Sequence, residues 1–237
     1  MKAVVLFSGG LDSTVLLYSL LDVVDVYALS FKYGSKHETQ ELRAAREIVR
    51  IPHIPHSTIE IPKWVFGDGS QLMMGGPNVS KEKYHEDGEQ PTVVPFRNGV
   101  LLSVATAFAE ARGYDIIYIA SHASDAEGYA YPDCTPKFTS YFAGAIQSGT
   151  MGRVSLLQPF AHLTKTDVVR VGHDLGVPFE LTWSCYSPQM TTDNEGQQTN
   201  ATNIIMVHCG ECATCRERRK AFKEAGVNDP TKYATVD

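Results

Sequence analysis

Apolar and polar positions along the first quarter of this 237-residue chain follow the order strand, helix, strand, helix, strand. Short apolar runs with β-branched residues predict buried strands, and apolar residues three or four positions apart predict helices. The predicted strands are residues 3–7, 25–31 and 57–61, and the predicted helices follow residue 10 and span residues 35–50. This order predicts a parallel sheet with right-handed crossovers and a ligand at the carboxyl ends of its strands.

The pattern is interrupted and then resumes. Residues 62–95 carry scattered glycines and no period, so we expect a lid or a solvent-exposed insertion there, with polar loop residues at His85, Glu86 and Asp87. The later segments predict strands at 115–120 and 154–157 and helices at 100–112, 136–148, 164–175 and 216–225, with a polar loop at 191–203. We therefore expect the α/β class, a doubly wound parallel sheet with a C-terminal appendage.

Composition narrows the functional classes. The net charge is −6, and the one basic run, Arg216 to Lys220, fits the solvated face of a helix. A protein that holds bulk nucleic acid usually shows a basic stripe, so we expect none as a partner. No apolar stretch is long enough to span a membrane, and Met1-Lys2 leads into a strand rather than a signal peptide, so we expect a cytoplasmic protein.

The first strand runs into a hexamer of small and polar residues, Ser8-Gly9-Gly10-Leu11-Asp12-Ser13. Its glycines allow a tight turn, and the helix N-terminus that follows suits a phosphate. Asp12 can cap that helix or hold a Mg²⁺ that accompanies a triphosphate. An ordinary strand-to-helix turn is the alternative. The hexamer resembles the SGGxDS loop of the ATP pyrophosphatases, which grips the β,γ-pyrophosphate while a substrate attacks the α-phosphorus.

Five cysteines suggest metal binding rather than disulfides. Three of them, Cys209, Cys212 and Cys215, form a Cys-x-x-Cys-x-x-Cys run, and Cys185 lies upstream. Four thiolates match a closed, structural Zn²⁺ site that would fasten the C-terminal tail. An iron–sulfur cluster is the competing interpretation. Cys134 lies outside this group and is either a buried small residue or part of an active site.

Several further motifs appear in a fixed order: Tyr33-Gly34, Lys36-His37, Glu41, Pro95-Phe96-Arg97-Asn98, Tyr131-Pro132-Asp133-Cys134, Leu163-Thr164-Lys165, Ser184-Cys185-Tyr186 and the cysteine run. Together they resemble the 7-cyano-7-deazaguanine synthases of the queuosine pathway, over nearly the whole chain. The resemblance implies a PP-loop fold, a zinc site and a homodimer. It also implies conversion of 7-carboxy-7-deazaguanine, ammonia and ATP to the nitrile, through adenylated intermediates and the 7-amide.

The resemblance assigns roles to particular residues. The pyrophosphate would be held by Ser8, Gly9, Gly10, Leu11, Asp12 and Ser13, with Lys165 as an added cation; Asp12, Lys165 and Arg97 would be catalytic. Lys165 opens a helix whose Thr164 and Asp167 are spaced as a near capping box. The substrate would be bound by Arg97, Asn98, His122, Asp125, Tyr131 and Asp133. Residues 1–180 would form the ATP and substrate domain, and residues 181–237 the zinc-binding region.

Three positions depart from the family pattern. Thr135 follows Cys134 where arginine is usual, Phe96 replaces a glycine, and Ser121-His122-Ala123 follows the fourth strand where a glycine is usual. These changes surround the substrate rather than the loop. A variant that stops at 7-amido-7-deazaguanine or adenylates a related carboxylate is therefore an alternative. A tRNA-thiolating enzyme would share the loop but normally carries a basic surface, and a non-catalytic binding module is the remaining class.

Overall fold

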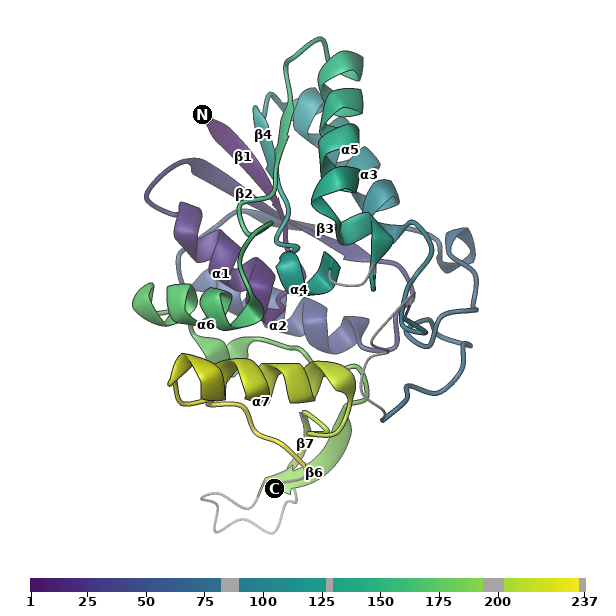
Figure 1. Cartoon of the computed structure of the whole chain (residues 1–237), viewed down its shortest axis with the longest axis vertical. Helices are drawn as coiled ribbons and strands as arrows, with labels where there is room; N and C mark the ends of the chain where they lie inside the picture. The colour runs from purple at the N-terminus through teal and green to yellow at the C-terminus, as the bar shows by residue number, and fades with distance from the viewer. Residues whose placement is uncertain (82–89, 127–129, 194–202, 235–237) are drawn as a thin grey trace.

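The computed structural model describes residues 1–81, 90–126, 130–193 and 203–234. Its centre is a five-stranded parallel sheet (Figure 1) formed by β1 (Lys2–Leu6), β2 (Asp25–Lys32), β3 (His56–Glu60), β4 (Ile116–Tyr118) and β5 (Ser155–Leu157). The strand order β3-β2-β1-β4-β5 reverses beside β1. In such a sheet the reversal opens a crevice outside the carboxyl ends of the central strands, where ligands bind. The predicted doubly wound parallel sheet is confirmed.

Helices cover both faces of this sheet (Figure 1). One layer contains α1 (Leu11–Leu20), α2 (Glu38–Arg50), α6 (Lys165–Asp174) and α7 (Ala213–Ala225), and the other contains α3 (Arg97–Arg112) and α5 (Pro136–Gly149). The short α4 (Ala123–Ala126) follows β4. Single 3₁₀ turns lie at Lys63–Val65, Pro132–Cys134 and Phe179–Leu181.

The alternation of side chains along β1 explains why both faces are covered. Ala3, Val5 and Phe7 belong to the core beneath α1 and α2, whereas Val4 and Leu6 belong to the core beneath α3 and α5. A strand buried on both faces is apolar throughout, as this one is. β1 therefore lies at the centre of the molecule, and the loop that follows it is held by both layers.

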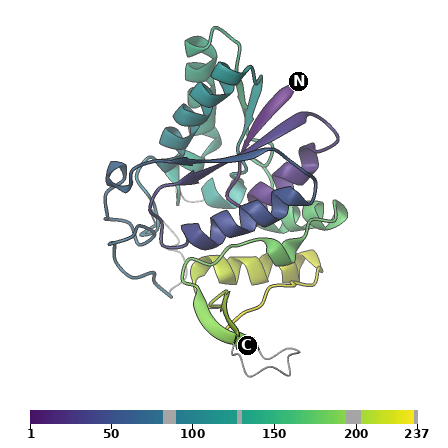
Figure 2. The same ribbon diagram turned by 180° about the vertical axis from the view of Figure 1, so that it is seen from behind.

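Residues 62–81, expected as a lid or a solvent-exposed insertion, are mostly exposed but contain a small buried core. They lie beside the carboxyl end of β3 (Figure 2), and Phe66, Leu72 and Met73 are buried in a small core with Tyr33. The Lys36 amide donates to the Leu72 carbonyl over 2.8 Å. Their apolar residues follow neither the helical nor the strand period, so pattern reasoning could not find this core. His85, Glu86 and Asp87 lie outside the described residues.

The polar loop expected at residues 191–203 has a β-strand at each end instead. β6 (Gln189–Asp193) and β7 (Asn203–Val207) pair antiparallel, with Gln189 opposite Val207. Met190 and Ile204 are exposed on this hairpin.

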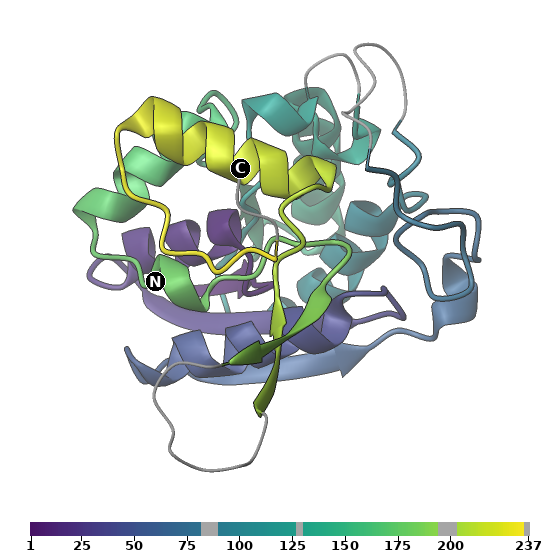
Figure 3. The same ribbon diagram turned by 90° about the horizontal axis from the view of Figure 1, so that it is seen from below.

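The C-terminal helix α7 is joined to the main core. It lies along α6 (Figure 3), and its Ala221 and Phe222 belong to the same apolar cluster as α1. The fully buried Arg218 donates to the Thr182 hydroxyl over 2.7 Å and pairs with Asp229 over 3.3 Å. No helix among the described residues is long and apolar enough to cross a membrane.

Candidate active site

The loop between β1 and α1 is shaped by a close approach to α2. Gly9 has φ +79°, in the left-handed region, and a Cβ there would lie 2.5 Å from the Ala45 nitrogen and 2.6 Å from the Glu41 carbonyl oxygen. Only glycine fits both the conformation and the space. Gly10 then serves as the N-cap of α1. The turn is thus built so that the first amides of α1, which have no intrahelical acceptor, face the end of the sheet.

Two serine hydroxyls are held next to this helix terminus. The Ser8 and Ser13 hydroxyls lie 3.1 Å apart, and the Gly10 amide donates to the Ser8 hydroxyl over 3.1 Å. Ser8 is exposed, whereas Ser13 is buried. Amides, hydroxyls and the positive end of the α1 dipole together make an anion-binding turn.

Asp12 and Lys165 form an ion pair at the same place, with Lys165 Nζ 3.1 Å from Asp12 Oδ2. The Thr164–Asp167 capping box fixes the start of α6 and with it the backbone of Lys165. The predicted capping box is confirmed. Burial raises the pKa of Asp12, but Lys165 and His122 lower it more, and the net pKa lies below its ordinary value. Burial lowers the pKa of Lys165, but Asp12, Glu217 and Asp125 raise it above its usual range. Both groups are therefore ionised.

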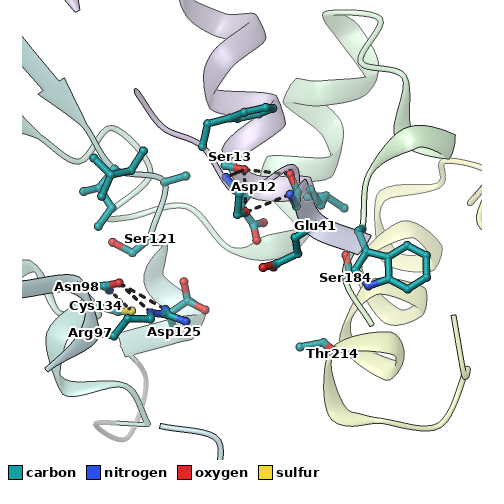
Figure 4. A pocket seen from close by; sticks show the side chains of 18 of the residues that line it. Asp12, Ser13, Glu41, Arg97, Asn98, Ser121, Asp125, Cys134, Ser184 and Thr214 are labelled. Atoms are coloured by element: carbon teal, nitrogen blue, oxygen red, sulfur yellow. Dashed lines mark hydrogen bonds between the residues drawn. The ribbon is translucent and has the colours of Figure 1, made fainter. Parts of the chain in front are cut away.

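A cleft of about 240 Å³ opens at the carboxyl ends of β1, β2 and β4. Its wall includes the loop residues Ser8, Gly10, Leu11, Asp12 and Ser13 and reaches Lys165 and Arg97. Figure 4 shows the Asp12, Glu41 and Arg97 side chains arriving from different elements around this space. The position agrees with the predicted ligand site at the carboxyl ends of the strands.

Arg97 supplies a second cation to the cleft. It begins α3, and within the described part of the chain its guanidinium makes long contacts only, 3.5 Å to the Tyr33 hydroxyl and 3.4 Å to the Asn98 amide oxygen. Burial lowers the pKa of Arg97, but Tyr33, Cys134, Asp133 and Tyr186 raise it above its usual range. A charged guanidinium held this loosely is suited to bind a carboxylate or phosphate in a forked geometry.

Glu41, which the sequence reasoning left without a role, lies in the same cleft. Burial raises the pKa of Glu41 to about 8; Arg97 lowers it and Glu38 raises it. His37 Nε2 lies 3.6 Å from Glu41 Oε2, and burial lowers the pKa of His37 to about 3, so its imidazole is neutral. Only the helical spacing of His37 and Glu41 in the motif could have indicated that they act together.

The side chains of the four C-terminal cysteines lie close together. The sulfur atoms of Cys185, Cys209, Cys212 and Cys215 all lie within 4.8 Å of one another, and all four residues are buried. Zn–S bonds of about 2.3 Å place tetrahedral sulfurs about 3.8 Å apart. The Cys209–Cys215 separation is 3.9 Å, and backbone amides donate to the Cys185 and Cys209 sulfurs. This cluster is suited to hold one Zn²⁺.

Comparison with known proteins decides the family. The sequence model described as queuosine biosynthesis protein QueC matches residues 2–226. A protein of Porphyromonas gingivalis named 7-cyano-7-deazaguanine synthase is 38% identical over 233 residues, covering 98% of this chain and 96% of that protein. One of the same name from Methanospirillum hungatei is 40% identical over 237 residues, covering 98% of this chain and 100% of that protein.

The chain belongs to the QueC family.

Residues near the four cysteines complete the cleft of this QueC family member, which the sequence reasoning did not foresee. Trp183, Ser184, Tyr186, Thr214 and Glu217 all contribute to its wall. The Trp183 amide donates to the Gly9 carbonyl over 2.9 Å, so the cysteine region contacts the loop directly. The position of the cysteine region therefore affects the geometry of the cleft.

The residues assigned to the substrate are not all in the wall. Asn98, Asp125 and Tyr131 line the cleft together with Arg97. Asp133 instead accepts the Asn98 amide over 2.8 Å, and thereby holds the start of α3. His122 is 1% exposed, with Nε2 3.5 Å from Asp12 Oδ1 and 3.6 Å from Asp125 Oδ2. These two residues are placed to position their neighbours.

The departures from the QueC pattern have a structural explanation at two positions. Phe96 has φ +52°, so a phenylalanine occupies a backbone conformation that favours glycine. Its ring packs edge-on against Phe138, with ring centroids 5.8 Å apart, and over Gly99, where a Cβ would lie 2.3 Å from it. Thr135 caps α5 by accepting the Phe138 amide. Cys134, whose pKa burial raises well above the usual value, is a neutral thiol.

Proposed function

We propose that this chain converts 7-carboxy-7-deazaguanine, ammonia and ATP to 7-cyano-7-deazaguanine, the activity for which its relatives are named. One observation carries the proposal: the anion-binding loop, Lys165 and Arg97 surround a single cleft in a QueC family member. A carboxylate is a poor electrophile, so the reaction needs an activating group on its oxygen. It also needs one cationic group beside the triphosphate and one beside the carboxylate, which serve as anchors. The cleft provides these anchors.

In the first step the substrate carboxylate attacks the α-phosphorus of ATP, forming an acyl-adenylate and releasing pyrophosphate. The loop residues Ser8 to Ser13 would bind the departing pyrophosphate, and Lys165 would move from Asp12 toward it as charge develops. Arg97 would align the carboxylate, with Asn98, Asp125 and Tyr131 around the base and His122 and Asp133 behind them. Catalysis of this type rests on alignment and charge stabilisation.

Ammonia then displaces AMP to give the 7-amide. A second adenylation, on the amide oxygen, allows AMP to leave again as the nitrile forms. The same anchors serve both adenylations, because the leaving pyrophosphate is the same. Of the residues that depart from the family pattern, Phe96 and Thr135 lie outside the wall of the cleft, whereas Ser121 lies in it, so the product assay distinguishes the nitrile from the amide.

Two metal ions accompany this proposal. Mg²⁺ would neutralise part of the triphosphate charge, and Asp12 fits it because its buried Oδ1 has no hydrogen-bond partner among the described residues. Zn²⁺ would be held by the four cysteines and would fix residues 181–237 against the ATP and substrate domain, residues 1–180. We also propose that the enzyme is a homodimer, which light scattering in solution would test.

The test is mass spectrometry of the products formed from 7-carboxy-7-deazaguanine, ATP, Mg²⁺ and ammonium. Nitrile with AMP is expected, and Lys165→Met should lower the rate of AMP formation by about 10²-fold. Lys220→Met, an exposed lysine on α7, is the matched control and should leave it unchanged. The amide alone would replace the proposal with the truncated reaction, and absence of both AMP and product would refute it.

A further inference from the structure

Glu41 has a carboxyl group inside the cleft that forms no ion pair with a lysine or arginine among the described residues. Its side chain keeps 21% of its surface exposed, and no hydrogen bond to a described residue holds its carboxylate. The neutral His37 lies 3.6 Å from it. The packing of α2 against Gly9 fixes where Glu41 stands relative to the loop.

The charged and titratable groups facing Glu41 come from four elements. Arg97 begins α3, Glu38 and His37 share α2, Tyr33 follows β2, and Tyr186 follows Cys185. Burial raises the pKa values of Tyr33 and Tyr186, so both phenols are neutral. Arg97 is the one cation of this set, and it makes no ion pair with Glu41 within 4.0 Å in the described structure.

The other carboxylates and the imidazole of the cleft are less suited to accept a proton. Asp12 and Glu217 flank the Lys165 ammonium at 3.1 and 4.0 Å. Burial raises the pKa of Glu217 as it does that of Glu41, but Glu217 faces this cation, which lowers it. Asp125 accepts the backbone amide of His122 over 3.2 Å. His37, with its pKa lowered by burial, is a weak base. When two carboxyl groups in one site have pKa values that differ, they take different roles. Here Asp12 stays ionised and stabilises charge, and Glu41 is left to accept a proton.

The proposed function leaves one chemical requirement unassigned. When ammonia adds to an acyl-adenylate, the new nitrogen carries a positive charge until it loses a proton. When the adenylated amide collapses to a nitrile, the remaining N–H proton must also be removed. Both steps need a proton acceptor near the reacting carbon.

We propose that Glu41 is the general base that removes one N–H proton in each of the two nitrogen steps; this inference rests on the proposed function. In the first, the N–C bond forms, one N–H proton passes to Glu41, and AMP departs with the electrons of the C–O bond. In the second, the adenylated amide loses one proton to water and the other to Glu41 as the C–O bond breaks and AMP leaves. Glu41 returns each proton to water.

The experiment separates three reactions in the full-length enzyme. ATP–pyrophosphate exchange with 7-carboxy-7-deazaguanine reports adenylation alone. Amide formation from that acid and ammonia reports the first nitrogen step. Nitrile formation from 7-amido-7-deazaguanine and ATP reports the second without free ammonia, so its pH profile contains no ammonia titration. Glu41→Gln keeps the size of the side chain and removes the base. Glu47→Gln, on the outer face of α2, is the matched control.

Glu41→Gln is expected to keep pyrophosphate exchange within a few-fold, and to lower both nitrogen steps by about 10²- to 10⁴-fold. The rise of nitrile formation with pH should disappear in this variant, and Glu41→Asp should retain part of it. Hydroxylamine, whose adduct loses its proton to water more readily than that of ammonia, should partly rescue the first step as the hydroxamate.

Two results would overturn the inference. An equal fall in exchange and in both nitrogen steps would assign Glu41 to substrate binding, and unchanged nitrogen steps would exclude it from the reaction. No exchange in the wild-type enzyme would instead refute the proposed function, and this inference with it.

Discussion

The packing of α2 on the phosphate loop makes Gly9→Ala an informative perturbation. The new Cβ would lie 2.5 Å from the Ala45 nitrogen and 2.6 Å from the Glu41 carbonyl oxygen, whereas real Cβ atoms stay beyond 3.0 Å. The left-handed conformation costs an alanine about 1–2 kcal/mol. Overpacking against a backbone that cannot turn aside adds about 1–3 kcal/mol. We expect a loss of about 2–5 kcal/mol from a total stability of about 5–15 kcal/mol.

Gly113→Ala is the matched control, because Gly113 has φ +69° at the C-cap of α3 and no atom within 4 Å of an added Cβ. It should lose only the conformational part, about 1–2 kcal/mol. Equilibrium urea unfolding of both variants measures the difference, provided that the unfolding slopes agree. The same loss in both variants would refute the close approach of α2 to the loop. Pyrophosphate exchange should also fall in Gly9→Ala alone, since the loop must shift with the helix.

Three further predictions concern buried groups. Because burial raises the pKa of Glu41 from 4.5 to about 8, the folded state retains a proton that the unfolded state releases in this window, and stability falls as pH rises through it. Glu41→Gln should therefore gain stability over wild type between pH 5 and 8, by up to a few kcal/mol in urea titrations; parallel pH curves would contradict this. If the four cysteines hold zinc as proposed, Cys212→Ser should lose it by metal analysis and lower the melting temperature, whereas Cys134→Ser should keep it; zinc retained in both variants would exclude the four-sulfur site. Arg218→Ala should lower the free energy of unfolding by about 3–5 kcal/mol because Asp229 is left without its cation. Lys220→Ala, at an exposed position, should change it by less than about 0.5 kcal/mol. Similar unfolding curves for the two variants would show that the buried ion pair does not stabilise the fold.

Local features of this protein could be read from its sequence. The apolar runs predicted the strands and the doubly wound sheet, and the Thr164–Asp167 spacing predicted a capping box that the structure contains. The spacing of Cys209, Cys212 and Cys215 and the presence of Cys185 predicted a sulfur cluster that the fold assembles. Such features depend on residues close in sequence or on residue types with few other roles, so they can be predicted without knowledge of the fold.

The composition of the cleft depended on the tertiary structure. Glu41 reaches it because α2 packs on a loop 30 residues earlier, and Glu217 reaches it because α7 lies along α6. His122 and Asp133, adjacent in sequence to residues of the wall, point to Asp12 and to the start of α3 instead. Which face of a helix meets a site is set by long-range packing of apolar surfaces, and no local pattern carries that information.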